Sequence, residues 1–235
     1  MKLGIFKGMP QEEYLKIQGL SKTSAAKLLA SKSHYKAYLD GDFEPTDDMN
    51  FGTAVDNALF YHDLPLAEYP KATKKDKAYR DALHGMIEVI DGCKTASYLI
   101  SGGEAQVSLV WEYDGVLMRS RPDYLREDVN IMTDYKTART GRWEKWKWQA
   151  RDLGYDIQAA IAIDGMFKLT GESYDFVFIV QEKKPPYFLN IYSAPDEMID
   201  EGREKYMEAA PLFREFMENK TAPAFLDEIQ EDLYW

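Results

Sequence analysis

Two short strings of this sequence place acidic and basic side chains at spacings that suit metal-ion chemistry. Asp134 and Lys136 lie two residues apart in a segment with strand character, so both side chains point to one face. Asp123 ends the strand expected before it. Because neighbouring antiparallel strands lie about 4.8 Å apart, Asp123 and Asp134 can converge on one cation.

Carboxylates paired in this way favour a hard divalent cation. Two carboxylates, a main-chain carbonyl and waters form an all-oxygen site that suits Mg²⁺ or Mn²⁺. Such an ion lowers the pKa of a bound water and neutralises charge on a phosphodiester. A lysine beside the ion can orient the attacking water and stabilise developing charge. The alternative is that Asp134 and Lys136 form an ordinary ion pair on a solvated strand.

Length and composition exclude several other classes of protein. The 235 residues suit one compact domain, and the aromatic fraction of 14% excludes global disorder. Cys93, the one cysteine, excludes a disulfide framework and a cysteine-based zinc site. The sequence has no HxH or HExxH spacing, no glycine-rich phosphate loop, no GxSxG string and no membrane-spanning apolar run. Without a secretion signal, we expect a cytoplasmic protein with no membrane partner.

The charge is distributed unevenly along the chain. The net charge of −11 argues at first against nucleic acid as a partner. Between residues 136 and 151, however, six bases accompany a single acid, whereas residues 196–235 carry twelve acids and four bases. Screening limits each patch to about 8–10 Å, so an acidic protein can still hold a basic groove.

Hydrophobic periodicity predicts the elements that must position these side chains. Helical spacing is found at residues 20–40, 49–61, 77–92, 155–169 and 196–218. Strand patterns are found in a hairpin over 104–125, turning at Asp114-Gly115, and at 129–137, 174–180 and 187–193. A turn is expected at 45–48 and a lysine-rich loop at 62–76. The order predicts a mixed α/β fold with a central, hairpin-bearing sheet.

Six strings resemble, in order, the PD-(D/E)XK nuclease superfamily, most closely its RecE-type and lambda-type phage exonuclease branch. They span residues 20–165 and are LSKTSAAKLL, FGTAVDNALF, GEAQVSLVW, RSRPD, DYKTA and YDIQAA. Each string is weak alone, but their order and spacing are specific. The resemblance implies an α/β, restriction-endonuclease-like core, with a mixed central sheet flanked by helices. It implies one nuclease domain with a helical N-terminal part (1–95), a catalytic sheet core (96–195) and an acidic C-terminal helix and tail (196–235).

The resemblance also assigns roles to the two strings. Asp123 matches the first metal-ligand aspartate. Asp134 matches the second, with the Tyr135 carbonyl as a third ligand, and Lys136 matches the catalytic lysine. Asp56 falls where RecE-type members carry histidine and where the lambda-type branch has an acid nearby, which implies an extra metal ligand.

A downstream pair completes the implied catalytic set. Tyr155 and Gln158 resemble the superfamily's Gln/Tyr motif, which steadies the site or touches the DNA strand. Their spacing puts both on one helix face. The alternative is a buried glutamine that caps a strand.

Further residues are candidates for DNA contact. Arg119 and Arg121 share strand parity with Asp123 and can hold phosphates. Ser24, with Lys22, falls where lambda-type enzymes hold a terminal 5′-phosphate. In a segment of interleaved bases and indoles, Arg142 and Lys145 can bind phosphates and Trp143 can stack on bases. The alternative for Trp143 is a core contact with Trp146, past which lysine stems run.

The activity implied is a Mg²⁺- or Mn²⁺-dependent exonuclease acting on double-stranded DNA ends, 5′ to 3′. Its products would be 3′ single-stranded tails and 5′-mononucleotides. The family further implies a homo-oligomeric ring, trimer or tetramer, that works with a single-strand annealing protein in phage-type recombination, in bacterial or phage-infected cells. Alternatives are an endonuclease or repair nuclease of the same superfamily, and a non-catalytic DNA-binding module.

Overall fold

The structure is a computed structural model that describes residues 2–41, 46–60 and 74–222. Its helices are α1 (Gln11–Lys16), α2 (Lys22–Ala30), α3 (Lys32–Asp40), α4 (Asp47–Phe60), α5 (Lys74–Gly92), α6 (Lys94–Leu99), α7 (Trp143–Asp152), α8 (Tyr155–Thr170) and α9 (Asp196–Asn219). Its strands are β1 (Gly4–Phe6), β2 (Glu104–Ala105), β3 (Ser108–Tyr113), β4 (Val116–Ser120), β5 (Tyr124–Arg126), β6 (Ile131–Ala138), β7 (Asp175–Glu182) and β8 (Leu189–Ser193).

Some sequence expectations fall outside the described residues. These are position 45 of the expected turn, most of the loop expected at 62–76, and the tail after residue 222. The α5 helix already begins at Lys74, inside the expected loop. Within the described chain, none of the helices combines the length and hydrophobicity needed to cross a lipid bilayer.

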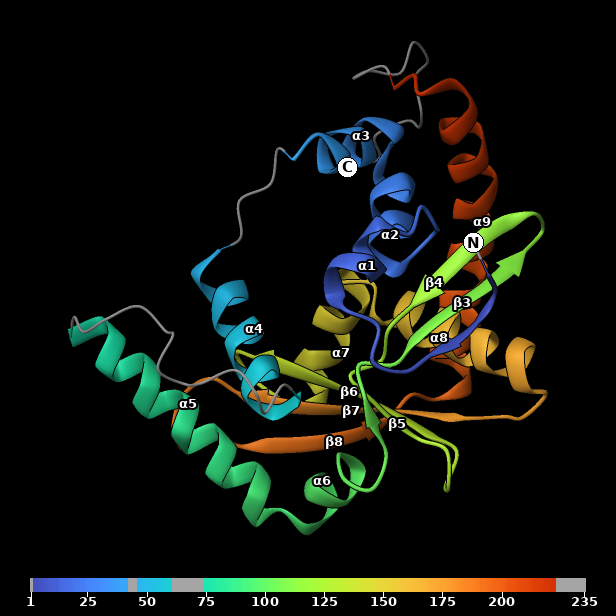
Figure 1. The fold of residues 1–235 in the computed structure, drawn as a ribbon. Helices are drawn as coiled ribbons and strands as arrows, with labels where there is room; N and C mark the ends of the chain where they lie inside the picture. The colour runs from blue at the N-terminus through green and yellow to red at the C-terminus, as the bar shows by residue number, and fades with distance from the viewer. Residues whose placement is uncertain (1, 42–45, 61–73, 223–235) are drawn as a thin grey trace.

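The described strands form two sheets, which confirms the mixed α/β class. A five-stranded sheet has the order β2-β5-β6-β7-β8, and a three-stranded sheet has the order β1-β3-β4. β6 and β7 are parallel, with Asp134 opposite Phe178, and α7 and α8 form the crossover between them. The remaining pairs are antiparallel. Figure 1 shows α5 and α6 along one side of the larger sheet and α9 on the opposite side.

The hairpin expected over 104–125 is divided between the two sheets. Its tip pairs β3 with β4, but its base pairs β2 with β5 in the larger sheet. The first arm of the hairpin changes sheet at Gln106, which has a left-handed φ of 53°. The second arm changes sheet after Ser120. Asp123 therefore directly precedes β5, and the prediction that it ends the second hairpin strand is wrong. A change of sheet leaves little trace in an alternating pattern, since the side chains on both sides of it still alternate.

The helix expected over 20–40 is two helices. Ser31 has extended backbone and accepts a hydrogen bond from the His34 N–H, so it caps the start of α3 where α2 has ended. Serine competes for backbone donors in this way, which makes it a better cap than an interior helix residue. The N-terminal part also contains β1, and α6 follows α5 directly; neither element was expected.

Two hydrophobic clusters cover opposite faces of the larger sheet. Met132 and Ala138 of β6 pack with α8 and α9 in one cluster, whereas Tyr135 packs with α4 and α5 in the other. Asp134 and Lys136 have the same strand parity as Met132 and so belong to the α8 face. The alternation of β6 thereby determines which helices surround the acid–lysine pair.

Glycine at position 202 allows α8 and α9 to approach closely. A Cβ there would lie 2.1 Å from the Asp156 carbonyl oxygen. We expect Gly202→Ala to lower the free energy of unfolding by about 1–3 kcal/mol, because the clash is with backbone. The same change gains about 1 kcal/mol of helix propensity, so Gly92→Ala, with no atom near its added Cβ, should be neutral or stabilising. Urea unfolding checks both, and equal midpoints for the two variants would contradict the prediction.

Candidate active site

A cleft of about 340 Å³ opens between the N-terminal helices and the two sheets. Residues of α1, α2, α3, α4, β4, β6 and α8 line it. Its charged and amide side chains include Lys22, Asp56, Gln106, Arg119, Arg121, Asp123, Lys136 and Gln158. Of the five predicted catalytic residues, three line the cleft, namely Asp123, Lys136 and Gln158. Asp134 and Tyr155 each contact residues that line it.

β6 and α8 together enclose the Asp134 carboxylate, which is 1% exposed. Lys136 forms an ion pair with Oδ2, and Gln158 Nε2 donates a hydrogen bond of 2.5 Å to Oδ1. Gln158 reaches this position because α8 begins after Gly154, whose left-handed backbone turns the chain. Asp134 is buried and the Lys136 side chain is 18% exposed, so the alternative of an ion pair on a solvated strand does not describe the pair.

The Asp123 carboxylate accepts one hydrogen bond from the main chain and one from a side chain. Its Oδ2 accepts a hydrogen bond of 2.8 Å from the Tyr135 N–H, and its Oδ1 accepts one of 3.1 Å from Gln106 Nε2. Burial raises the pKa of the Asp123 carboxyl well above its usual value, and the charges of Asp134 and Asp56 raise it further. The two aspartates are thus close enough to interact, as the strand spacing predicts.

Asp56 reaches the same cleft from α4. A Cβ at Gly52, one turn earlier, would lie 3.3 Å from Thr137 Oγ1, so glycine lets α4 lie close to β6. Burial raises the pKa of Asp56 to about 7; Lys136 lowers it and Asp134 raises it. Asp56 is therefore electrostatically coupled to the acid–lysine pair.

Two lysines lie over one aromatic ring. Lys136 Nζ is 4.7 Å and Lys22 Nζ is 5.3 Å from the Tyr155 ring centroid. Burial opposes the charge of Lys136, but Asp134, Tyr155 and Asp123 hold its pKa above the ordinary value. Burial, and then repulsion from Lys136, lowers the pKa of Lys22 to about 8. Both lysines line the cleft, where an anion would meet them together.

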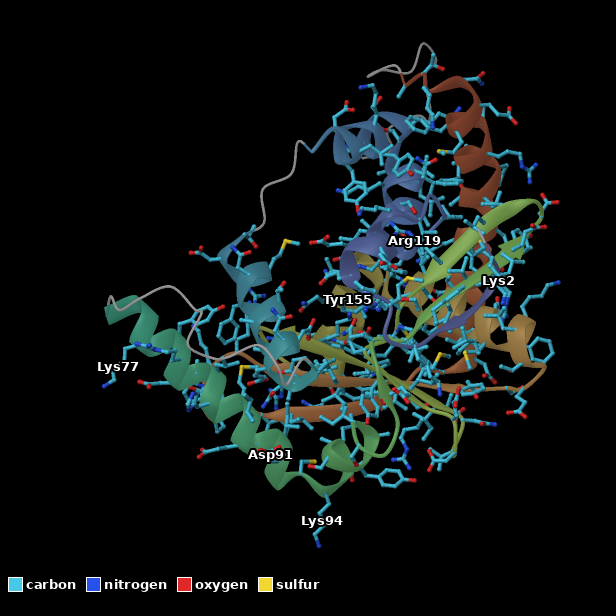
Figure 2. All side chains as sticks on the ribbon, viewed as in Figure 1. Lys2, Lys77, Asp91, Lys94, Arg119 and Tyr155 are labelled. Atoms are coloured by element: carbon cyan, nitrogen blue, oxygen red, sulfur yellow. The ribbon has the colours of Figure 1, made fainter. Side chains whose placement is uncertain are left out.

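Figure 2 shows Tyr155 and Arg119 in the interior of the molecule, whereas Lys77, Asp91 and Lys94 lie at its outer edge. Arg119 Nη1 donates to the Tyr14 carbonyl at 2.6 Å, and Arg121 Nη2 donates to the Met9 carbonyl at 2.7 Å. Both guanidinium groups also lie over the Tyr14 ring.

The two arginines therefore hold the α1 segment in place as well as lining the cleft. The strand parity predicted for them with Asp123 is wrong, because β4 ends at Ser120. Their contact with phosphate stays a prediction.

Ser24 does not line this cleft. It is 3% exposed, and its hydroxyl bonds to Ser21 in a capping box at the start of α2. This burial does not fit the predicted contact between Ser24 and a terminal phosphate. Lys22 and Thr23, on the same helix, line the cleft.

The basic, Trp-rich segment lies apart from the cleft. Trp146 is 1% exposed and packs in the core, as the alternative interpretation of this segment predicted. Trp143 is 40% exposed and contacts both Trp146 and Tyr192. Arg142 and Lys145 accompany it at the start of α7. Any contact of these three residues with DNA would use a surface separate from the cleft.

The acids of the cleft suit a hard cation by their chemistry. Within the described residues, no three His, Cys, Asp or Glu side chains are placed to hold a metal ion by themselves. Asp56, Asp123 and Asp134 nevertheless share one region, where burial raises the pKa of the first two and repulsion from neighbouring aspartates raises it further. A divalent cation would relieve that repulsion, so the residues present fit Mg²⁺ or Mn²⁺.

The main chain and side chain of Tyr135 have separate surroundings. Its side chain points to the other face of the sheet, where its hydroxyl donates to Gln181 Oε1 at 2.6 Å. Its N–H binds Asp123. The role predicted for its carbonyl, as a third metal ligand, stays a prediction.

Gln106 is a residue of the site that sequence reasoning missed. Glu104 is the charged residue of the string GEAQVSLVW. Glu104 is exposed and lies 4.0 Å from Lys7, outside the cleft. The signal available in the sequence was the position of Gln106, a polar residue between Glu104 and the apolar run of the β3 strand.

Comparisons with known proteins bear on the family and the fold. The family described as a PDDEXK-like domain of unknown function (DUF3799) matches residues 21–230. A crystal structure from Eubacterium rectale, of a protein provisionally named an exonuclease, aligns with a TM-score of 0.75 at 17% identity, over 98% of this chain and 97% of that one. That likeness shows a shared fold. Among curated proteins, none matches the sequence.

Two further structures have weaker likeness. A phage-related exonuclease from Haemophilus somnus 129PT aligns with a TM-score of 0.40 at 13% identity, covering 86% of this chain and 96% of that one. An alkaline exonuclease from Laribacter hongkongensis aligns with a TM-score of 0.42 at 15% identity, covering 89% and 97%. Both are too distant to support an inference about this chain.

Proposed function

Since this chain belongs to the family of PDDEXK-like domains of unknown function (DUF3799), we propose that it is a metal-dependent deoxyribonuclease that digests linear duplex DNA from its ends. The observation that carries the proposal is the meeting of Asp123, Asp134 and Lys136 beside one cleft. Electrostatic coupling of two buried carboxylates and a lysine in a cleft is typical of a catalytic site.

The side chains of the cleft would divide the work as follows. Asp123 and Asp134, with Asp56, would hold Mg²⁺ or Mn²⁺. The cation, when bound, lowers the pKa of water and offsets the charge of the phosphodiester. Lys136 Nζ orients the attacking water and stabilises charge that develops on the phosphate. Gln158 keeps Asp134 in place, and Tyr155 supports Lys136 through its ring face.

The finer properties of the activity rest on the resemblance to the RecE-type and lambda-type branch. We propose 5′-to-3′ digestion that leaves 3′ single-stranded tails and releases 5′-mononucleotides. The same resemblance supports a single nuclease domain that assembles as a ring of three or four copies. It also supports work with a single-strand annealing protein in phage-type recombination, in the cytoplasm. The name given to the Eubacterium rectale protein agrees with an exonuclease.

End dependence is the test of this proposal. With Mg²⁺ or Mn²⁺, linear duplex DNA should release mononucleotides from its ends and become single-stranded, and covalently closed circular DNA of the same sequence should stay intact. Labels at the 5′ or the 3′ end, followed over time, report the strand polarity, and a chelator should stop the reaction. Nicking or linearisation of the circle would favour the endonuclease. DNA binding without cleavage under several metals would favour the non-catalytic module.

A further inference from the structure

Gln106 occupies the point where the chain leaves one sheet for the other. β2 ends at Ala105 in the larger sheet, and β3 begins at Ser108 in the smaller one. Gln106 makes the change with a φ of 53°, a region that residues other than glycine, asparagine and aspartate seldom adopt. A left-handed backbone conformation at a residue other than glycine costs about 1–3 kcal/mol and tends to occur at functional sites.

The side chain and main chain of Gln106 both bind Asp123. Its N–H donates to the Asp123 carbonyl at 2.8 Å, and its Nε2 donates to the Asp123 Oδ1 at 3.1 Å. The other carboxylate oxygen, Oδ2, accepts from the Tyr135 N–H. Each oxygen of Asp123 therefore has one donor, and an ionised carboxylate has about four acceptor positions in all. The two donors orient the carboxylate, and some of its acceptor positions remain without a donor from these two residues.

We propose that Gln106 is the positioning residue of the Asp123 carboxylate, and that it orients this carboxylate for a divalent cation in the cleft. This inference rests on the proposed function. The Gln106 side chain itself lines the cleft. A partner that orients a ligand carboxylate typically contributes about 10–100-fold to metal affinity.

The replacement Gln106→Asn separates positioning from folding. Asparagine adopts left-handed backbone more readily than glutamine, so the change of sheet is preserved. Its side chain is shorter by one methylene and loses the hydrogen bond to Oδ1. The matched control is Glu104→Gln, two residues earlier on an exposed position outside the cleft. Urea unfolding of both variants should match the wild type within about 1 kcal/mol, the usual net value of one hydrogen bond.

The experiment is a calorimetric titration of each protein with Mn²⁺ in the absence of DNA. Gln106→Asn should bind Mn²⁺ about 10–100-fold more weakly than the wild type, and Glu104→Gln should bind equally well. In DNA digestion, Gln106→Asn should need a correspondingly higher Mn²⁺ concentration for half-maximal rate, with kcat at saturating Mn²⁺ and KM for DNA near wild type. A residue with a merely structural role would not shift the metal requirement alone.

The outcomes separate this inference from the function on which it rests. Equal Mn²⁺ affinity in Gln106→Asn and in a wild type that binds Mn²⁺ and digests DNA would overturn the positioning role alone. A wild type that neither binds Mn²⁺ nor digests DNA would overturn both the proposed function and this role.

Discussion

Asp134→Asn should lower the rate of DNA cleavage by about 10³-fold or more, at the upper end of losses reported for a single transition-state contact. Asparagine has nearly the same shape as aspartate, so the packing around this 1% exposed side chain is kept. The change removes one of the carboxylates proposed to hold the cation and also removes the buried counterion of Lys136. The initial rate of nucleotide release from linear duplex DNA measures the effect.

The chain supplies a matched control for this substitution. Asp156 is 2% exposed and forms an ion pair with Lys205, so it resembles Asp134 in burial and in partner. Its side chain lines a separate pocket with residues of α7 and α9 and does not line the cleft. Breaking a buried pair costs about 3–5 kcal/mol of stability, and both asparagine variants should show a loss of this kind.

Only Asp134→Asn should lose DNA cleavage, measured below the unfolding temperature of both variants. Wild-type rates in Asp134→Asn would remove the catalytic assignment. Equal losses of rate in both variants would mean that stability, and not chemistry, is affected.

Trp146→Ala should lower the free energy of unfolding by about 3–5 kcal/mol, the range for truncating a buried aromatic residue to alanine. The indole of Trp146 stacks on Tyr192 at a centroid distance of 5.3 Å and meets Phe178 edge-on at 5.4 Å. It also packs against Tyr155, whose ring underlies the two cleft lysines. Its N–H has no hydrogen-bond partner among the described residues, so the expected loss comes from packing.

Trp143→Ala is the matched control, three residues earlier on the same helix. Trp143 is 40% exposed, so less apolar surface is returned to water and we expect less than half the loss of Trp146→Ala. Urea unfolding followed by circular dichroism measures both. A smaller loss in Trp146→Ala than in Trp143→Ala would show that the core does not depend on the buried indole.

The sequence predicted the features that depend on residues close together in the chain. The strand predicted at 129–137 correctly put Asp134 and Lys136 on one face, because strand parity is a property of neighbouring residues. The order of helices and strands gave the mixed α/β class for the same reason. The break at Ser31 was missed because the apolar spacing continues across it, although serine is a residue type that commonly caps the start of a helix.

Features that depend on distant contacts could not be predicted in this way. The hydrogen bonds of Arg119 and Arg121 to the α1 segment join residues more than 100 positions apart. Gln106 meets Asp123 only because the hairpin changes sheet at both positions. Asp134 is approached by Gln158 from a crossover helix whose docking the periodicity of either element does not specify.

The parallel pairing of β6 with β7 has a consequence for the order of folding. Parallel strands require a long crossover, and pairing across a long loop is among the slow events of folding. The crossover here contains α8 and therefore Gln158, whose side chain donates a hydrogen bond to Asp134. We therefore expect the hydrogen bond of Gln158 to Asp134 to form only after this long-range strand pairing, whereas Asp123 and Asp134 are brought together by the local pairing of β5 with β6.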